Sequence, residues 1–98
     1  GGDAPVLAGD TSLLELDARG CVLSACKPAP DGDGIVVRVL NPTDTSEPVR
    51  LRFGREVGRV HAVGLDEQPV EYPLTHRGRE VELPVPAHAL RSVRVSFR

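Results

Sequence analysis

Two segments near the middle of the chain alternate between faces with the period of a β-strand. In the segment 35–40, Ile-Val-Val-Arg-Val-Leu, one face is wholly apolar and the other is mixed, and in the segment 49–53, Val-Arg-Leu-Arg-Phe, apolar residues alternate with arginines. The residues between them include Asn41 and Pro42 and favour a turn, because Asn, Asp, Ser and Pro are common turn residues. The pattern predicts a local hairpin whose aliphatic side chains point inward and whose arginines lie in water.

The same alternation recurs along the rest of the chain at intervals of about ten residues, and no long window has a helical period. Further strands are predicted over 14–19, 21–26, 59–65, 70–74, 81–85 and 93–98, with turns at 54–58 and at Arg77-Gly78. Pro73 places the segment 70–74 at a sheet edge, since proline cannot donate to a ladder. The sequence therefore predicts an all-β fold over residues 12–98, an antiparallel β-sandwich of about seven or eight short strands with the general architecture of an immunoglobulin domain. Residues 1–11 are rich in glycine and are predicted to be a linker or a disordered lead-in.

Length and composition restrict the classes of function. Ninety-eight residues are enough for one domain. Basic and acidic residues are interspersed and give a net charge of −2, so no basic stripe predicts nucleic acid or an anionic membrane as a partner. No apolar run approaches the roughly 20 residues of a membrane-spanning helix. The chain contains no methionine, not even at position 1, which predicts that it is a fragment of a longer polypeptide.

The two cysteines, Cys21 and Cys26, fall on one predicted strand. Five residues apart on a regular strand, they point to opposite faces, and their Cα atoms lie roughly 16 Å apart at about 3.3 Å per residue. A disulfide needs Cα atoms within about 7 Å. We therefore expect two free thiols that act as small apolar residues, which fits a reducing compartment and predicts a cytoplasmic protein.

The sequence predicts no catalytic, cofactor-binding or metal-binding residue in this chain. The three histidines, His61, His76 and His88, are far apart, and none has a cysteine or a pair of carboxylates at ligand spacing. No serine is combined with a nearby histidine and aspartate in a way that suggests a nucleophile. The loop 31–34, Asp-Gly-Asp-Gly, fails as an EF-hand because its fifth and twelfth positions are Ile35 and Pro42, so it is predicted to be a turn.

The stretch from 23 to 42 resembles the C-terminal β-domain of the family 38 glycoside hydrolases, the retaining α-mannosidases. The matching residues are Leu23, Ser24, Ala25, Lys27, Pro28, Ala29, Asp31, Gly32, Asp33, Gly34, Arg38, Asn41 and Pro42. The similarity continues through 63–71 and 81–95 and covers roughly residues 12–98. It implies a non-catalytic domain that packs against, and supports, the catalytic domain of a zinc-dependent retaining α-mannosidase. Zinc and the aspartate nucleophile of such an enzyme are expected in that other domain and not in this chain.

Two other functions are weighed against this interpretation. A carbohydrate-binding module usually stacks sugar rings on exposed Trp or Tyr. This chain has no Trp, Phe53 and Phe97 fall on apolar strand faces, and Tyr72 alone makes no platform. A free-standing adhesion or receptor sandwich is disfavoured by the missing methionine and by the similarity over residues 27–42.

The outward face of the segment 35–40 raises a question about partners. Val36 and Leu40 lie opposite the inward residues, where a solvated strand would carry polar residues, and Val22 and Cys26 repeat the anomaly on the preceding strand. One interpretation is a docking face for the remaining domains of the same polypeptide, through which the isolated domain would self-associate. The alternative, given equal weight, is that these strands are central and covered on both faces.

Overall fold

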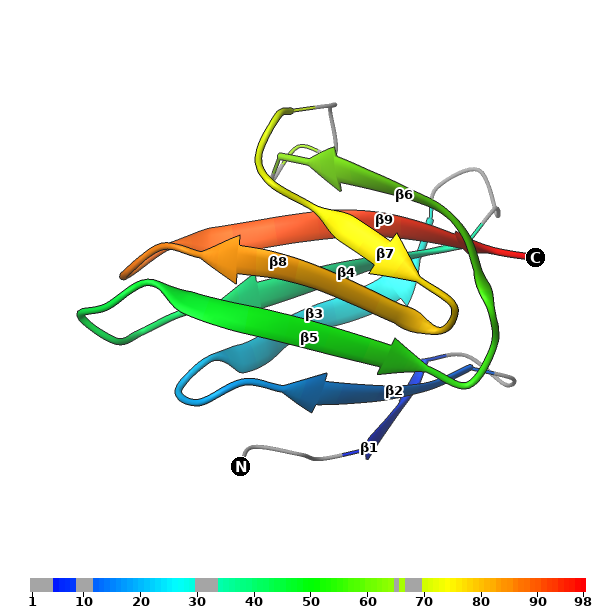
Figure 1. Cartoon of the computed structure of the whole chain (residues 1–98), viewed down its shortest axis with the longest axis horizontal. Helices are drawn as coiled ribbons and strands as arrows, with labels where there is room; N and C mark the ends of the chain where they lie inside the picture. The colour runs from blue at the N-terminus through cyan, green and yellow to red at the C-terminus, as the bar shows by residue number, and fades with distance from the viewer. Residues whose placement is uncertain (1–4, 9–11, 30–33, 65, 67–69) are drawn as a thin grey trace.

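The computed structural model describes residues 5–8, 12–29, 34–64, 66 and 70–98, and these residues form nine strands in two antiparallel sheets (Figure 1). The strands are Pro5–Ala8 (β1), Ser12–Asp17 (β2), Val22–Pro28 (β3), Ile35–Leu40 (β4), Glu47–Phe53 (β5), Val57–Val63 (β6), Thr75–Arg77 (β7), Glu80–Val85 (β8) and Leu90–Phe97 (β9). One sheet has the order β1-β2-β5-β8-β7 and the other the order β3-β4-β9-β6. The predicted antiparallel β-sandwich is confirmed. These ranges contain no helix long and apolar enough to cross a membrane.

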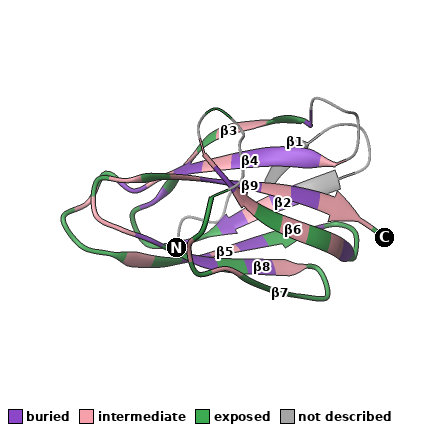
Figure 2. Ribbon diagram, turned by 90° about the horizontal axis from the view of Figure 1, so that it is seen from above, coloured by how far each residue is buried: buried purple, intermediate pink, exposed green. Residues whose placement is uncertain are grey.

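The core lies between the two sheets and is made by the inward positions of their strands, which appear as the buried segments of the two layers in Figure 2. The alternation seen in the sequence produces it directly: Val49, Leu51 and Phe53 of β5 are at most 2% exposed, whereas Arg52 between them is exposed. The Phe53 ring meets the ring of Phe97 edge to face, with centroids 5.4 Å apart. The buried members are Leu14, Leu16, Ala18, Cys21, Ile35, Val37, Val39, Val49, Leu51, Phe53, Val57, Val81, Leu83, Val85, Val93 and Val95.

Part of the segment expected to be a linker is a strand. Pro5–Ala8 form β1, which pairs with β2 in the register Val6 to Leu14 and Ala8 to Ser12. The four residues lie along the edge of β2 that β5 does not occupy, so the free ladder groups of that edge explain the strand. Residues 1–4 and 9–11 of the expected lead-in lie outside the described residues.

The predicted hairpin between 35–40 and 49–53 is wrong, although both segments are strands. β4 pairs with β3 and β9, whereas β5 pairs with β2 and β8 in the other sheet, so the connection crosses the sandwich. Asn41 lies at the crossing and is fully buried; its backbone N–H donates to Ala89 O (2.9 Å) and its side-chain amide to Val85 O (2.9 Å). Turn residues show that the chain bends, but tertiary hydrogen bonds decide which sheet it enters.

The predicted edge strand over 70–74 is also wrong. These residues link β6 to β7 without joining either sheet, although Val70 N–H donates to Ala62 O (3.1 Å). Tyr72 and Leu74 are partly buried against the core. Pro73 interrupts any ladder, and β7 starts only at Thr75. The predicted turn after Arg77 is confirmed, with Gly78 in the left-handed conformation (φ 60°) between β7 and β8.

A β-bulge in β3 changes which way the cysteines point. The register of β3 against β4 shifts between Leu23 and Ala25, so Leu23 lies opposite Val39 and Cys26 opposite Val37. Cys21 is buried in the same core, against which Cys26 packs. The prediction that the two thiols point to opposite faces is therefore wrong, because the extra residue of the bulge reverses the alternation. Both cysteines are free, as predicted.

The native protein should protect both thiols from alkylation. Burial raises the pKa of the Cys21 and Cys26 thiols, with Glu47 adding to the shift at Cys21, so less of each is the reactive thiolate at about pH 8 than in the unfolded chain. We expect two thiols to react in denaturant. In native protein, Cys26 should react before Cys21, because Cys21 is only 6% exposed. Mass spectrometry after timed iodoacetamide labelling measures this; a count of zero thiols in denatured, non-reduced monomer would contradict it.

The sequence left open whether the outward face of β4 is exposed or covered, and the structure shows both at different positions. Val36 is 2% exposed and forms a second, small cluster with Ala29 and Val63. The strand is therefore covered at Val36, and the prediction that this side chain is exposed is wrong. Val22, which lies on the same side of the sheet, is 47% exposed. One end of this face is therefore covered and the other is open.

Matched threonine substitutions should separate the two ends of this face. Thr replaces Val with almost the same shape and adds a hydroxyl, which costs about 1–2 kcal/mol of stability when buried without a partner. We expect Val36→Thr to lower the free energy of unfolding by about this amount, and Val22→Thr to change it by less than about 0.5 kcal/mol. Urea unfolding measures both; equal effects would show that Val36 is no more buried than Val22.

Candidate functional site: a proline-lined groove

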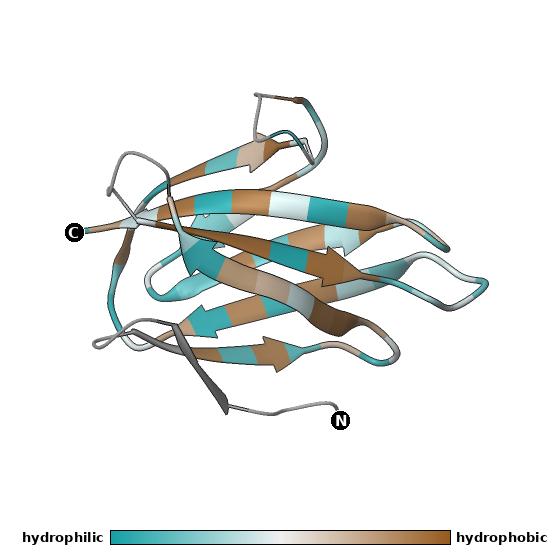
Figure 3. Cartoon of the chain, turned by 180° about the vertical axis from the view of Figure 1, so that it is seen from behind, coloured by the Kyte–Doolittle hydropathy of each residue, from teal (hydrophilic) through white to brown (hydrophobic). Residues whose placement is uncertain are grey.

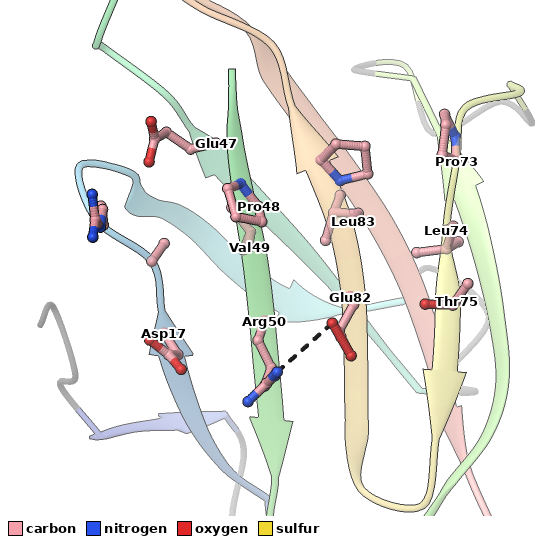
Figure 4. A pocket seen from close by; sticks show the side chains of 13 residues that line it. Asp17, Glu47, Pro48, Val49, Arg50, Pro73, Leu74, Thr75, Glu82 and Leu83 are labelled. Atoms are coloured by element: carbon pink, nitrogen blue, oxygen red, sulfur yellow. Dashed lines mark ion pairs between the residues drawn. The ribbon is translucent and has the colours of Figure 1, made fainter. Parts of the chain in front are cut away.

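A groove with a volume of about 720 Å³ lies across one end of the five-stranded sheet, on its outward side (Figure 4). Its floor comes from the neighbouring strands β5 and β8, and its walls come from the end of β2 and from the segment that leads into β7. The lining residues are Asp17, Ala18, Arg19, Glu47, Pro48, Val49, Arg50, Pro73, Leu74, Thr75, Glu82, Leu83 and Pro84.

Three exposed prolines give the groove its apolar surface. Pro48 of β5 pairs directly with Pro84 of β8, and Pro73 lies just before β7. Proline has no N–H, so Pro48 and Pro84 cannot donate hydrogen bonds to each other. At such a pair of antiparallel strands, the backbone nitrogens point away from the partner, toward the next strand on the other side, which is β2 for Pro48 and β7 for Pro84. Those neighbours are missing at this level, because β2 ends at Asp17 opposite Arg50 and β7 begins at Thr75 opposite Glu82. The prolines therefore sit where the ladder needs no donor.

Next to the prolines, charged side chains cross the outward face in rows. Asp17, Arg50 and Glu82 share one row, and Arg52 and Glu80 lie in the next. Arg52 donates to Glu80 Oε2 from Nη2 (2.9 Å) and Nε (3.1 Å), and this carboxylate raises the pKa of the Arg52 guanidinium. Arg50 lies 3.8 Å from Glu82 and 3.9 Å from Glu80. Exposed pairs of this kind contribute little stability, and they neutralise one another on a solvated surface.

The polar residues that line the groove are three carboxylates, two arginines and one threonine. The lining includes no histidine, cysteine or serine, and its central arginine and glutamate are paired with each other. Such a surface can contact a neighbouring chain through its prolines. The sequence analysis missed the groove; the spacing of Pro48, Pro73 and Pro84 at strand ends was the available signal.

The histidines that the sequence analysis considered are dispersed. His61 is exposed on β6 and His76 is exposed on β7, in the other sheet. His88 Nε2 lies 2.7 Å from Asp44 Oδ1, and this pair joins the turn before β9 to the crossing segment after β4. Within the described ranges, no three His, Cys, Asp or Glu side chains are grouped so that they could hold a metal ion.

Of the Asp-Gly-Asp-Gly loop, only Gly34 is described, since residues 31–33 lie outside the described ranges. Gly34 has a φ of 91°, and a Cβ placed there would lie 2.0 Å from the carbonyl oxygen of Val95. The expectation that a glycine supplies a positive φ before the strand is confirmed at this position.

All three aromatic residues of the chain are at least partly buried. Phe53 and Phe97 contact each other, and Arg55 lies over the Phe97 ring at 5.3 Å. Tyr72 donates from its hydroxyl to Ser92 O, its ring lies 4.6 Å from the Arg91 guanidinium carbon, and burial raises the pKa of its hydroxyl. No ring is left as a flat exposed platform for a sugar.

Comparison with known proteins gives one result. A family model described as the glycosyl hydrolases family 38 C-terminal beta sandwich domain matches residues 20–97. The match takes in every strand from β3 to β9. No curated protein and no solved structure matches the chain.

Proposed function

Since the chain belongs to the family of C-terminal β-sandwich domains of the family 38 glycosyl hydrolases, we propose that it packs against the catalytic part of its parent enzyme and supports it. The domain itself is non-catalytic. The observation that carries the proposal is the match over residues 20–97. The surface of the sandwich agrees with it, because it offers a proline-lined groove and exposed apolar residues.

The finer identity of the parent belongs to the same proposal. We infer a zinc-dependent retaining α-mannosidase acting in the cytoplasm, on the similarity of residues 23–42 and on two free thiols that fit a reducing compartment. The described residues do not fit zinc, since they contain no group of three ligands. We assign the metal, the nucleophile and the second carboxylate to the catalytic domain.

A carbohydrate-binding module is the weaker alternative. Recognition of a pyranose ring by stacking needs an accessible aromatic face. The chain's rings are instead engaged with one another, with Arg55 or with Arg91. Soaking or titration with mannose oligosaccharides should therefore give no saturable binding to the isolated domain.

The isolated chain should not hydrolyse aryl α-mannosides, with or without added zinc. Retaining hydrolysis needs two carboxylates about 5 Å apart, acting as nucleophile and acid/base. Of the carboxylates that line the groove, Glu82 lies in an ion pair with Arg50, and Glu47 Oε2 accepts a hydrogen bond from Thr45 Oγ1. Release of the aryl alcohol, followed by absorbance, should equal the buffer blank. Turnover that copurifies with the chain and disappears in Glu82→Gln, but not in the exposed control Glu56→Gln, would overturn the assignment as non-catalytic.

The packing role is tested in the parent polypeptide. Removal of residues 12–98 should lower the melting temperature of the catalytic part and make it prone to aggregation, because the surface that it buries against this domain becomes exposed. Differential scanning calorimetry of the parent and of the truncated form measures this. An unchanged melt and unchanged turnover after truncation would reject a supporting role.

A further inference from the structure

The three prolines of the groove lie in one row across the five-stranded sheet. Pro48 pairs with Pro84, and the register of β7 against β8, continued by two residues, places Pro73 at the level of Pro84. The register of β2 against β5, continued in the same way, places Arg19 at the level of Pro48. Figure 4 shows Pro48 and Pro73 toward the same end of the groove. Because prolines have no N–H, an added strand cannot form a regular ladder along this row, and an occupant must contact it through side chains.

The exposed proline rings favour an aromatic side chain as the occupant. The face of an aromatic ring carries negative partial charge, which complements the C–H groups of a proline ring. The same pairing occurs with the roles exchanged where proline-rich segments dock in aromatic-lined grooves. The groove has a volume of about 720 Å³, within the range of about 300–1,000 Å³ in which a pocket encloses a drug-sized molecule. It therefore has room for a ring and the groups beside it.

The polar groups of the groove favour a donor with positive charge beside the ring. The lining has three carboxylates and two guanidinium groups. Arg50 lies 3.8 Å from Glu82, which leaves Asp17 and Glu47 against Arg19 alone. The carbonyl oxygens of the proline pair point away from each other, toward levels that β2 and β7 do not reach, and so add backbone acceptors. A lysine or arginine satisfies both the acceptors and the excess of negative charge.

We infer that the proline-lined groove receives an aromatic side chain and a neighbouring lysine or arginine from the catalytic part of the parent enzyme. The inference rests on the proposed function and adds which surface is used and what its counterpart is made of. A second copy of the chain does not supply the ring, because the three aromatic residues of this chain are at least partly buried and contact other side chains.

The direction of β1 agrees with a neighbour at this end of the sheet. β1 begins with Pro5 opposite Glu15 and runs to Ala8 opposite Ser12. β2 then runs back to Asp17, which lines the groove. In a parent where the sandwich is the C-terminal domain, the preceding polypeptide therefore joins β1 on the side of the groove. Such a tether raises the effective concentration of the neighbouring domain to the millimolar range.

The four-stranded sheet offers a competing surface, which serves as the internal comparison. On its outward side, Val22 lies opposite Leu40 and Leu40 opposite Leu90, and these residues form an apolar row. Val22 is 47% and Leu90 39% exposed. Figure 3 shows this sheet from behind, with brown apolar segments interrupted by teal polar ones. Further along the same side, Val36 is already covered within the chain.

Hydroxyl-radical footprinting of the parent polypeptide and of the isolated domain tests which surface is used. In the parent, we expect several-fold slower oxidation of Pro48, Leu74 and Pro84, while Val22 and Leu90 keep the rates that they have in the isolated domain. Protection of Val22 and Leu90 with an unprotected groove would overturn the inference and leave the proposed packing intact. Equal rates at every residue would reject the packing itself.

Two small probes test the chemistry of the groove on this chain alone. Tryptamine carries an indole ring and a positively charged amine, whereas indole-3-acetate carries the same ring and a carboxylate. In a titration followed by nuclear magnetic resonance, millimolar tryptamine should shift the amide signals of Glu47, Leu74 and Leu83 saturably, and indole-3-acetate should shift them several-fold less. Equal shifts would overturn the basic part of the counterpart. No shift with either probe would overturn the aromatic part.

A charge-removing double variant tests the carboxylates. Asp17→Asn with Glu47→Gln keeps the side-chain shapes and should weaken the binding of tryptamine and the protection of Leu74 in the parent several-fold. Glu56→Gln, at an exposed turn outside the groove, is the matched control and should change neither. Melts of the isolated domains show whether each variant folds. Unchanged binding and protection in a folded double variant would overturn the charge complementarity.

Discussion

Replacing Asn41 with alanine should destabilise the domain by about 3–5 kcal/mol, a large share of the about 5–15 kcal/mol that holds such domains folded. The Asn41 amide donates to Thr45 O (2.8 Å) and Val85 O (2.9 Å), and its Oδ1 accepts from Thr43 N (2.9 Å) and Thr43 Oγ1 (2.6 Å). Alanine removes these four hydrogen bonds at a position that is fully buried. The connection between β4 and β5 therefore loses the side chain that bonds it to β8.

Urea unfolding followed by far-ultraviolet circular dichroism measures the effect, and the melting temperature should fall by roughly 12–40 °C, at about 4–8 °C per kcal/mol. Ser46→Ala is the matched control, because Ser46 is exposed in the same connection. It should change the free energy of unfolding by less than about 0.5 kcal/mol. If Asn41→Ala melted like Ser46→Ala, the amide would not be what fixes the crossing.

Gly34→Ala should be nearly as damaging, at about 2–5 kcal/mol, for two reasons that add. The backbone of Gly34 has a φ of 91°, which a residue with a Cβ adopts only at a cost. The new Cβ would also lie 2.0 Å from Val95 O and 2.9 Å from Val95 C, atoms of the backbone of β9 that cannot rotate away. Either the start of β4 or β9 must move.

Gly78→Ala separates these two costs. Gly78 has a φ of 60°, but a Cβ there would meet nothing within 4 Å. We therefore expect Gly78→Ala to cost only about 1 kcal/mol, the penalty for the left-handed conformation. The same urea measurement compares the two variants. Equal losses would show that the close approach of Gly34 to β9 contributes nothing.

Most of the strands and the core could be predicted from the sequence, because alternation is a local property. The buried residues of β5 and β8 are the ones that the period of two places on the apolar face. Arg50 and Arg52 were predicted in water; Arg52 is exposed and Arg50 only partly so, since it leans over the strand toward Glu80 and Glu82. The wrong predictions have one cause. The strand β1, the bulge in β3 and the absence of a strand over 70–74 all depend on which neighbouring strand a segment pairs with.

The candidate surfaces were beyond the sequence for the same reason. The groove exists because β2 and β7 stop short of Pro48 and Pro84, and strand ends follow from pairing. Val22, Leu40 and Leu90 are far apart along the chain and become one row only through the registers of β3, β4 and β9. Val22 and Leu40 were suspected from their unexpected apolar character, but Leu90 was not. Val36 lies on the same side as Leu40, as predicted, and is covered there, whereas Cys26, predicted to point outward, packs against the core.

By itself, the sequence determined the class of the fold, the inward face of most strands, the free thiols and the family to which the chain belongs. Those features follow from the period of side chains along a strand and from motifs contained in a short stretch. Only the tertiary structure decided that β4 and β5 lie in different sheets, that the Asn41 amide at the crossing donates to Val85 O, and that the Asp and Glu residues of the described strands all lie in the five-stranded sheet. Those features depend on contacts between residues distant in the chain, whose energies are realised only when both sheets are in place.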